Sequence, residues 1–309
     1  MRRCEVTRLD TDLGGIALRN PVMVASGCFH YGREFAPYMD LRELGAVIVK
    51  SLSLRPWPGH APPRGTETPS GMLNAIGLQN PGIDSFAAKE LPWLVKQKVP
   101  VVASVVGNTV EEYTRVAERL RGAPGVVALE VNISCPNLED RSQMFSASAD
   151  ATASVVRGVR RVATQPIFTK LSPDVTDIVA IARAAVDAGS QGLSVMNTTL
   201  GMAIDVEHLR PRLSTLTGGL SGPAVRPIAI RCVFQVAQAF PDVPIIGQGG
   251  VNHGDDVAEF LLAGAWAVAV GTANFSNPTA SLRILREFEE YLHRKGIEGP
   301  DELRRRLKL

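Results

Sequence analysis

Residues 129–137 read Leu-Glu-Val-Asn-Ile-Ser-Cys-Pro-Asn and follow directly on the apolar run Val-Val-Ala at 126–128. So many aliphatic and β-branched residues together are typical of a buried strand. Pro136 ends that strand, because proline has no amide hydrogen to give to a sheet. The strand therefore carries the amide of Asn132 and the thiol of Cys135 to its carboxyl end. Such a thiol is either a chemically active group or a small hydrophobic side chain packed in the core.

The rest of the chain repeats this kind of strand. Eight apolar segments have strand character, and most are separated by a segment with helical periodicity. They are residues 21–27, 46–54, 100–107, 126–134, 166–172, 192–198, 243–249 and 267–272. Eight strand–helix units predict an α/β protein, a (β/α)8 TIM barrel with parallel apolar strands inside and helices outside. A doubly wound open sheet is the alternative, but its phosphate-binding glycines would follow the first strand, whereas those here come late.

The segments around these units have their own signals. Residues 5–20 predict a two-stranded ribbon that turns at Gly14-Gly15 and closes the bottom of the barrel. Residues 175–188 predict a helix with one apolar face, and Gly189 is suited to end it. Two connections, residues 54–71 and 200–222, are too long to be plain turns. The second contains an apparent hairpin, and both are interpreted as covers of a site, with disorder as the alternative for the first.

Composition limits the class of protein. A length of 309 residues fits one barrel domain of about 250 residues with extensions, so residues 1–309 are predicted to form a single domain. A net charge of +2 argues against a nucleic-acid surface, and no apolar run is long enough for a membrane span. The four cysteines form no Cys-x-x-Cys pair, which argues against a disulfide framework, a metal site or an iron–sulfur cluster in this chain. We therefore expect a soluble cytoplasmic protein without a metal.

Polar side chains gather where the predicted strands end. In a TIM barrel the carboxyl ends of the strands form one rim, and the chemistry takes place there. These strand ends carry Ser26, Gly27, Lys50, Ser51, Ser104, Asn132, Cys135, Lys170, Asn197, Thr198, Gly249, Gly250, Gly271 and Thr272. Two lysines, two asparagines and a thiol on one rim predict a binding site. Cys28, close to the first strand end, is interpreted as a packing residue.

Glycines at the last two strand ends predict a phosphate site. Residues 247–250 read Gly-Gln-Gly-Gly and residues 270–273 read Val-Gly-Thr-Ala, and such backbones can approach an anion closely. Barrels commonly bind phosphate after strands seven and eight, and residues 218–222 could complete the cradle. Tight packing of strand on helix is the alternative explanation. With Lys50 and Lys170 on the same rim, the pattern favours a phosphate-bearing cofactor with an electron-rich part.

Three of these stretches together resemble the class 1 dihydroorotate dehydrogenases. They are Asn-Ile-Ser-Cys-Pro-Asn at 132–137, Asn-Ala-Ile-Gly-Leu-Gln-Asn-Pro-Gly at 74–82 and Gly-Gln-Gly-Gly at 247–250. The resemblance runs from about residue 13 to residue 277. It implies a barrel that binds one FMN per chain and oxidises dihydroorotate to orotate in pyrimidine biosynthesis.

The resemblance also implies roles for individual residues. Cys135 would be the catalytic base, a place where the membrane-associated class 2 enzymes carry serine. Lys50 would contact both the flavin and the carboxylate of orotate, and Lys170 would lie beside the flavin. The implied cofactor-binding residues are Ser26, Lys50, Ser51, Ser104, Asn132, Lys170, Met196, Gly222, Gly249, Gly250, Gly271 and Thr272. The implied substrate-binding residues are Lys50, Asn74, Ala75, Ile76, Gly77, Leu78, Asn132, Asn197 and Thr198.

Two features depart from the family pattern. Ser104 stands where many relatives have asparagine, and residues 138–149 lack the glycine- and histidine-containing pattern of the lid over the substrate. Related flavin barrels that act on dihydrouracil or dihydrothymine share the Asn-x-Ser-Cys-Pro pattern and are the main alternative. A tRNA-modifying flavin barrel and a non-catalytic barrel that binds a phosphate ligand are the others.

Residues 74–82 are similar to those of the NAD-linked subgroup rather than the fumarate-using one. In that subgroup a partner subunit carries FAD and a [2Fe-2S] cluster, and electrons pass through it to NAD. The resemblance therefore implies an electron-transfer partner, with a homodimer of this chain as the core of a heterotetramer. No nucleic acid and no membrane is expected among the partners.

Overall fold

The structure, a computed structural model, describes residues 8–134 and 145–308. Eight parallel strands close into a barrel in the order β10-β15-β16-β3-β4-β7-β8-β9. Their bounds are β3 Val22–Val24, β4 Ala46–Ile48, β7 Val101–Val105, β8 Val126–Asn132, β9 Ile167–Leu171, β10 Gly192–Val195, β15 Ile245–Gln248 and β16 Ala267–Val270. Each strand lies within one of the eight predicted segments, so the TIM barrel is confirmed and the open sheet was wrong.

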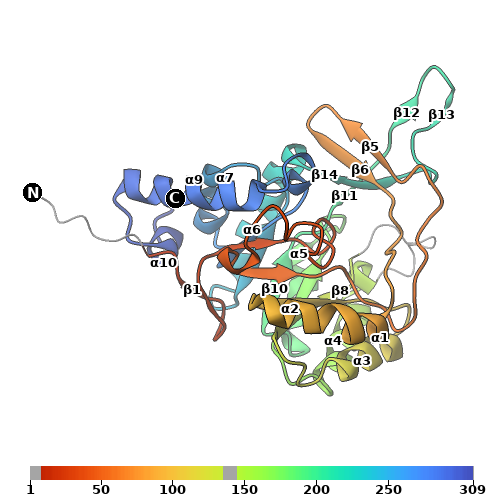
Figure 1. The fold of residues 1–309 in the computed structure, drawn as a ribbon, viewed down its shortest axis with the longest axis horizontal. Coiled ribbons are helices and arrows are strands. Elements are labelled where there is room, and N and C mark those ends of the chain that lie inside the picture. Colours follow the sequence, from red (N-terminus) through yellow and green to blue (C-terminus); the bar gives the residue numbers. More distant parts are fainter. Residues whose placement is uncertain (1–7, 135–144, 309) are drawn as a thin grey trace, which may run out of the picture.

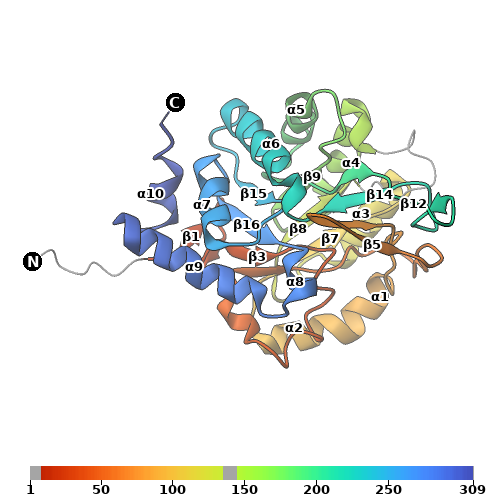
Figure 2. The ribbon, with the colours of Figure 1, turned by 90° about the horizontal axis from the view of Figure 1, so that it is seen from above.

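Helices surround this barrel on its outer side (Figures 1 and 2). They are α1 Ile83–Ser85, α2 Leu91–Gln97, α3 Val110–Arg119, α4 Ala149–Arg160, α5 Ile178–Asp187, α6 Arg226–Ala239, α7 Gly254–Leu262, α8 Ala273–Ser276, α9 Ala280–Lys295 and α10 Pro300–Arg304. The helix predicted at 175–188 is α5. The Asp177 carboxylate begins it by accepting hydrogen bonds from the amides of Val179 and Ala180, at 2.9 and 3.1 Å. Gly189, at a φ of +104°, follows its last turn as expected.

A short antiparallel ribbon closes the amino-terminal end of the barrel. It consists of β1 Thr11–Asp12 and β2 Ala17–Leu18. Its apolar side chains, Leu13, Ile16 and Leu18, belong to the same buried cluster as the inward-facing Met23, Ile48 and Phe168 of the barrel strands. The described part of the predicted ribbon therefore forms the floor of the barrel, as the sequence indicated.

The two long connections meet in a second sheet, which covers the carboxyl ends of the strands. Its order is β11-β14-β6-β5, with bounds β5 Gly65–Thr68, β6 Gly71–Asn74, β11 Thr199–Gly201 and β14 Gly218–Ser221. The predicted hairpin in the second connection is present as β12 Ile204–Asp205 and β13 Arg210–Pro211. Both ribbon views place this hairpin at the end of the molecule opposite α10 (Figures 1 and 2). Among residues 8–134 and 145–308, no helix combines the length and the apolarity that crossing a membrane requires.

The packing of the barrel floor makes a prediction about stability. Phe168 is 1% exposed, and its ring fills the space that a side chain at Gly192 would need. Phe168→Ala should lower the free energy of unfolding by about 3–5 kcal/mol, because a cavity replaces the ring. Tyr38→Ala is the control, since Tyr38 is 64% exposed and its truncation should cost no more than about 0.5 kcal/mol. Equal losses for both variants in urea unfolding would contradict this packing.

Candidate active site

A cavity of about 720 Å³ lies at the carboxyl ends of the barrel strands, with the β5, β6 and β14 strands contributing to its wall. Most of the predicted site residues line it. They are Ser26, Lys50, Ser51, Asn74, Ile76, Leu78, Asn132, Lys170, Met196, Asn197, Thr198, Gly222, Gly249, Gly250, Gly271 and Thr272. Residues that are far apart in the sequence thus converge on one cavity, which has the size of a typical site for a small ligand.

Three other predicted residues, Ser104, Ala75 and Gly77, are not part of this wall. Ser104 is fully buried behind the cavity wall, where its hydroxyl is 2.9 Å from the Ser51 hydroxyl. Ala75 is buried in a small apolar cluster of the covering sheet. Gly77 has a φ of +68°, and a Cβ there would lie 2.7 Å from the backbone nitrogen of His60, so the loop needs glycine. Cys135 lies outside the described residues. The roles of all the predicted site residues, those in the cavity wall included, stay predictions.

Amide and hydroxyl side chains form a network across the cavity floor. Asn132 donates from Nδ2 to the Ser51 hydroxyl at 3.0 Å, and Ser51 in turn is bonded to Ser104. Asn197 donates from Nδ2 to the carbonyl and hydroxyl oxygens of Ser134, at 2.9 and 3.0 Å. A network of this kind fixes the orientation of each amide before a ligand arrives.

Two lysines bring positive charge to the cavity. The Lys170 Nζ donates to the Ser26 hydroxyl at 3.3 Å and lies 3.8 Å from a Glu130 carboxylate oxygen. Lys50 lines the same cavity. Cys28 lines this cavity together with both lysines. This part of the wall is suited to an anionic ligand.

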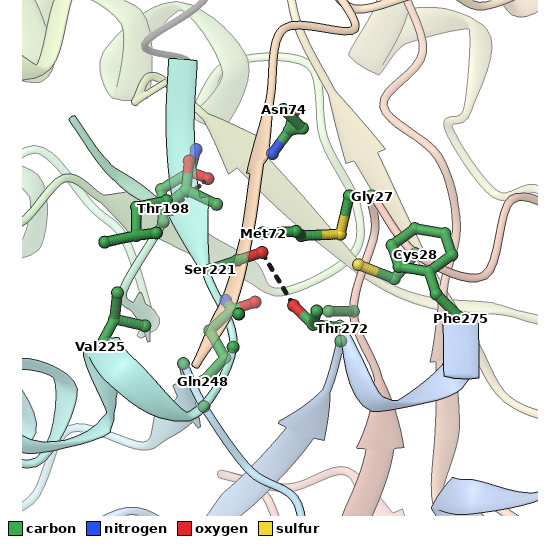
Figure 3. A pocket seen from close by; sticks show the side chains of 18 of the residues that line it. Gly27, Cys28, Met72, Asn74, Thr198, Ser221, Val225, Gln248, Thr272 and Phe275 are labelled. Atoms are coloured by element: carbon green, nitrogen blue, oxygen red, sulfur yellow. Dashed lines mark hydrogen bonds between the residues drawn. The ribbon is translucent and has the colours of Figure 1, made fainter. Parts of the chain in front are cut away.

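A glycine cradle forms another part of the wall. Gly222, Gly249 and Gly250 have φ values of +97°, +130° and +82°. A Cβ on Gly250 would lie 2.8 Å from the Gly222 carbonyl oxygen, so the two backbones approach each other too closely for side chains. Nearby, the Thr272 hydroxyl donates to the Ser221 hydroxyl at 2.9 Å and so joins the eighth barrel strand end to the covering sheet (Figure 3). Backbone amides at such a place can hold a phosphate.

Several cavity residues were not predicted. Met72 and Phe275 line the wall, and Figure 3 shows Phe275 next to Cys28. Gln248 is 4% exposed, and its Nε2 has no hydrogen-bond partner among the described residues. The alternation of a strand could have revealed Gln248, which is flanked by the glycines of the 247–250 motif. Met72 and Phe275 lie on segments without a periodic signal.

Comparison with known proteins identifies the family. The model of the family described as dihydroorotate dehydrogenase matches residues 8–292. The chain belongs to the dihydroorotate dehydrogenase family. A Geotalea daltonii protein named dihydroorotate dehydrogenase B (NAD(+)), catalytic subunit, is 52% identical over 97% of this chain and 98% of its own length. A protein of the same name from Anoxybacillus flavithermus is 50% identical over 96% of this chain and 95% of its own length.

The fold agrees with that family. The crystal structure of a dihydroorotate dehydrogenase from Eimeria tenella, solved in complex with ferulenol, superimposes with a TM-score of 0.82. The alignment covers 98% of this chain and 89% of that protein, but the identity is 22%, so it speaks for the fold alone. Family membership confirms the predicted class of enzyme, an oxidoreductase that acts on dihydroorotate, and the names of the relatives confirm the predicted NAD-linked subgroup.

The environment of Cys28 predicts an unreactive thiol. Burial raises its pKa from 9.0 to about 11, and the charges of Lys170 and Lys50 oppose this shift only in part. At pH 8 roughly one molecule in a thousand then carries the thiolate, compared with roughly one in ten for an unshifted thiol. Cys28 in the FMN-free protein should therefore react with iodoacetamide about a hundredfold more slowly than free cysteine does.

Peptide mapping by mass spectrometry distinguishes Cys28 from the other cysteines in this experiment. The same protein unfolded in urea is the control, because Cys28 should then be alkylated at the ordinary rate. Rapid alkylation of Cys28 in the native protein at pH 8 would contradict the raised pKa.

Proposed function

We propose that this chain is the FMN-containing catalytic subunit of an NAD-linked dihydroorotate dehydrogenase, which oxidises (S)-dihydroorotate to orotate in pyrimidine biosynthesis. One observation carries the proposal: two lysines, two ordered asparagines and a glycine cradle line a single cavity. This combination suits two ligands, an anionic substrate and a cofactor that carries a phosphate. Family membership supports the same conclusion.

The residues of the cavity fit FMN. Gly222, Gly249 and Gly250 would hold its phosphate, since glycine lets these backbone segments pack together where a side chain would clash. The Nε2 of Gln248 is a buried donor without an acceptor in the described part of the chain, and it would gain one when a ligand fills the cavity. Lys170 and Ser26 would lie at the ring system, where the ammonium suits the negative charge of the reduced form. When bound, FMN accepts the hydride that dihydroorotate loses.

The substrate residues follow from charge and hydrogen-bonding capacity. Lys50 would pair with the carboxylate of dihydroorotate. Asn74, Asn197 and Thr198 would bond the alternating donors and acceptors of its ring, and the Asn74 amide is already oriented by donating to the Gly219 carbonyl oxygen at 3.2 Å. Cys135 would take the ring proton from the carbon beside the one that loses hydride. The proton and the hydride together account for the two hydrogens that separate dihydroorotate from orotate.

A partner subunit completes the proposed enzyme. The relatives are named as catalytic subunits of an NAD(+)-linked enzyme, which supports an electron-transfer partner. We propose that this partner carries FAD and a [2Fe-2S] cluster and passes the electrons to NAD. Among residues 8–134 and 145–308, no three histidine, cysteine, aspartate or glutamate side chains form a group that could hold a metal ion. A single FMN-binding domain, a homodimer at the core of a heterotetramer and a cytoplasmic location stay predictions.

An anaerobic visible spectrum, recorded before and after adding dihydroorotate, tests this function. The wild-type protein should be yellow and should bleach promptly. Cys135→Ala should stay yellow but bleach about 10²–10⁴-fold more slowly, because a general base contributes that much to the rate. A yellow protein that bleaches with dihydrouracil and not with dihydroorotate would move the substrate to an uncharged dihydropyrimidine. A protein that takes up no FMN on reconstitution would refute the proposal.

The glycine cradle makes a separate prediction about FMN affinity. Gly250→Ala should raise the Kd for FMN at least about tenfold, because the added Cβ would displace the Arg226 and Gly222 backbone at the phosphate. Gly15→Ala is the matched control, since Gly15 also has a positive φ, +92°, but has no atom within 4 Å of an added Cβ. Fluorescence titration of each FMN-free variant measures the Kd. An equal change in both variants would mean that backbone strain, not the cradle, is responsible.

A further inference from the structure

Glu130 is a charged residue in the interior of the barrel, and the proposed function gives it no role. It lies on β8 two residues before Asn132, so both side chains point into the barrel. Asn132 lines the cavity, whereas Glu130 is absent from its wall and is 0% exposed. Glu130 therefore lies one layer below the cavity floor.

One neighbour, Lys170, compensates the negative charge of Glu130. Neither of its carboxylate oxygens accepts a hydrogen bond from the described part of the chain. The Lys170 Nζ lies 3.8 Å from one of them, and the Lys170 side chain is 6% exposed. A buried carboxylate is tolerated when an opposite charge compensates it. Lys170 is the described counter-charge, and the two residues form a buried ion pair.

The Lys170 ammonium thereby has two partners, one below the cavity floor and one at the cavity wall. Glu130 attracts its ammonium from below, and the Ser26 hydroxyl accepts a hydrogen bond from it at the cavity wall, at 3.3 Å. On the neighbouring strands its register partners are Asn132 and Ser194. A lysine side chain has four rotatable bonds, so its position depends on such attachments. Among the described residues Glu130 is the only carboxylate in ion-pair distance of this ammonium, so without it no such pair would hold the ammonium back from the cavity.

We propose that Glu130 is a positioning residue, which holds the Lys170 ammonium at the cavity floor and thereby limits the positive charge that Lys170 presents to the cofactor. The inference rests on the proposed FMN site. Reduced FMN carries more negative charge than oxidised FMN, so an ammonium that moves closer favours the reduced form. The carboxylate thus acts through Lys170 on the reduction potential of the bound flavin.

The test is the reduction potential of the FMN-loaded protein, measured anaerobically against a reference dye. In Glu130→Gln the ratio of reduced to oxidised FMN should rise about tenfold at the potential where the wild type is half reduced. For a two-electron couple this corresponds to about 30 mV. Glu130→Asp keeps the charge but withdraws it by one methylene, so its ratio should rise by a smaller factor. If Glu130→Gln does not fold, the ratio measured in Glu130→Asp tests the proposal by itself.

Two controls separate positioning from a direct charge effect. Glu67→Gln removes a carboxylate that lines the same cavity but is exposed, so water should keep its effect on the ratio below about twofold. In a Lys170→Gln background the effect of Glu130→Gln should fall to less than half, because no ammonium is left to be released. An equal effect in both backgrounds would show that Glu130 acts directly on the flavin and would overturn the proposal.

The result can be told apart from a failure of the proposed function. A wild-type protein that takes up no FMN would refute the FMN site itself. A wild-type protein that binds FMN and bleaches with dihydroorotate, while Glu130→Gln or Glu130→Asp keeps the wild-type ratio, would leave the function intact and remove the role of Glu130.

Discussion

Parallel strands closed into a ring allow their side chains two directions, outward to the helices or inward to the barrel axis. Along β8 the inward series is Ala128, Glu130 and Asn132, and along β9 it is Phe168 and Lys170. The interior therefore changes from apolar at the ribbon to polar at the cavity, where Lys170 and Asn132 are register partners. Every other feature depends on this order, because it fixes the height at which each functional group lies.

This dependence explains why so much of the structure could be predicted from the sequence. Each barrel strand is a continuous apolar run, since both of its faces are buried, and such runs stand out in a sequence. Once the strands are placed, the barrel rule assigns Lys50, Asn132 and Lys170 to one rim without further information. Two glycines of the cradle, Gly249 and Gly250, followed in the same way from the end of the seventh strand. The predictable features are those that follow from a local sequence pattern combined with the rule that the carboxyl ends of barrel strands share one rim.

The features that escaped prediction depend on contacts between distant segments. The pairing of β6 with β14 joins segments that lie about 145 residues apart, and neither segment has a pattern that names its partner. Met72 enters the cavity wall through that sheet. Glu130 lies within the apolar run of β8, yet the sequence of that run does not assign its role, because the ammonium beside it belongs to another strand. The role of Cys135 as catalytic base is implied by the family resemblance alone, because this residue lies outside the described residues.

The covering sheet also restricts how the enzyme can change over evolution. In most barrels each loop after a strand can be lengthened or replaced independently, which is why the fold supports many activities. Here the loops after the second and sixth barrel strands share backbone hydrogen bonds, with Gly219 paired to Asn74. An insertion within β6 or β14 would shift that register, and a shift of one residue turns every side chain to the opposite face. The two loops therefore constrain each other, and a chimera with only one of them exchanged would have to restore the β6–β14 pairing to keep the roof of its cavity.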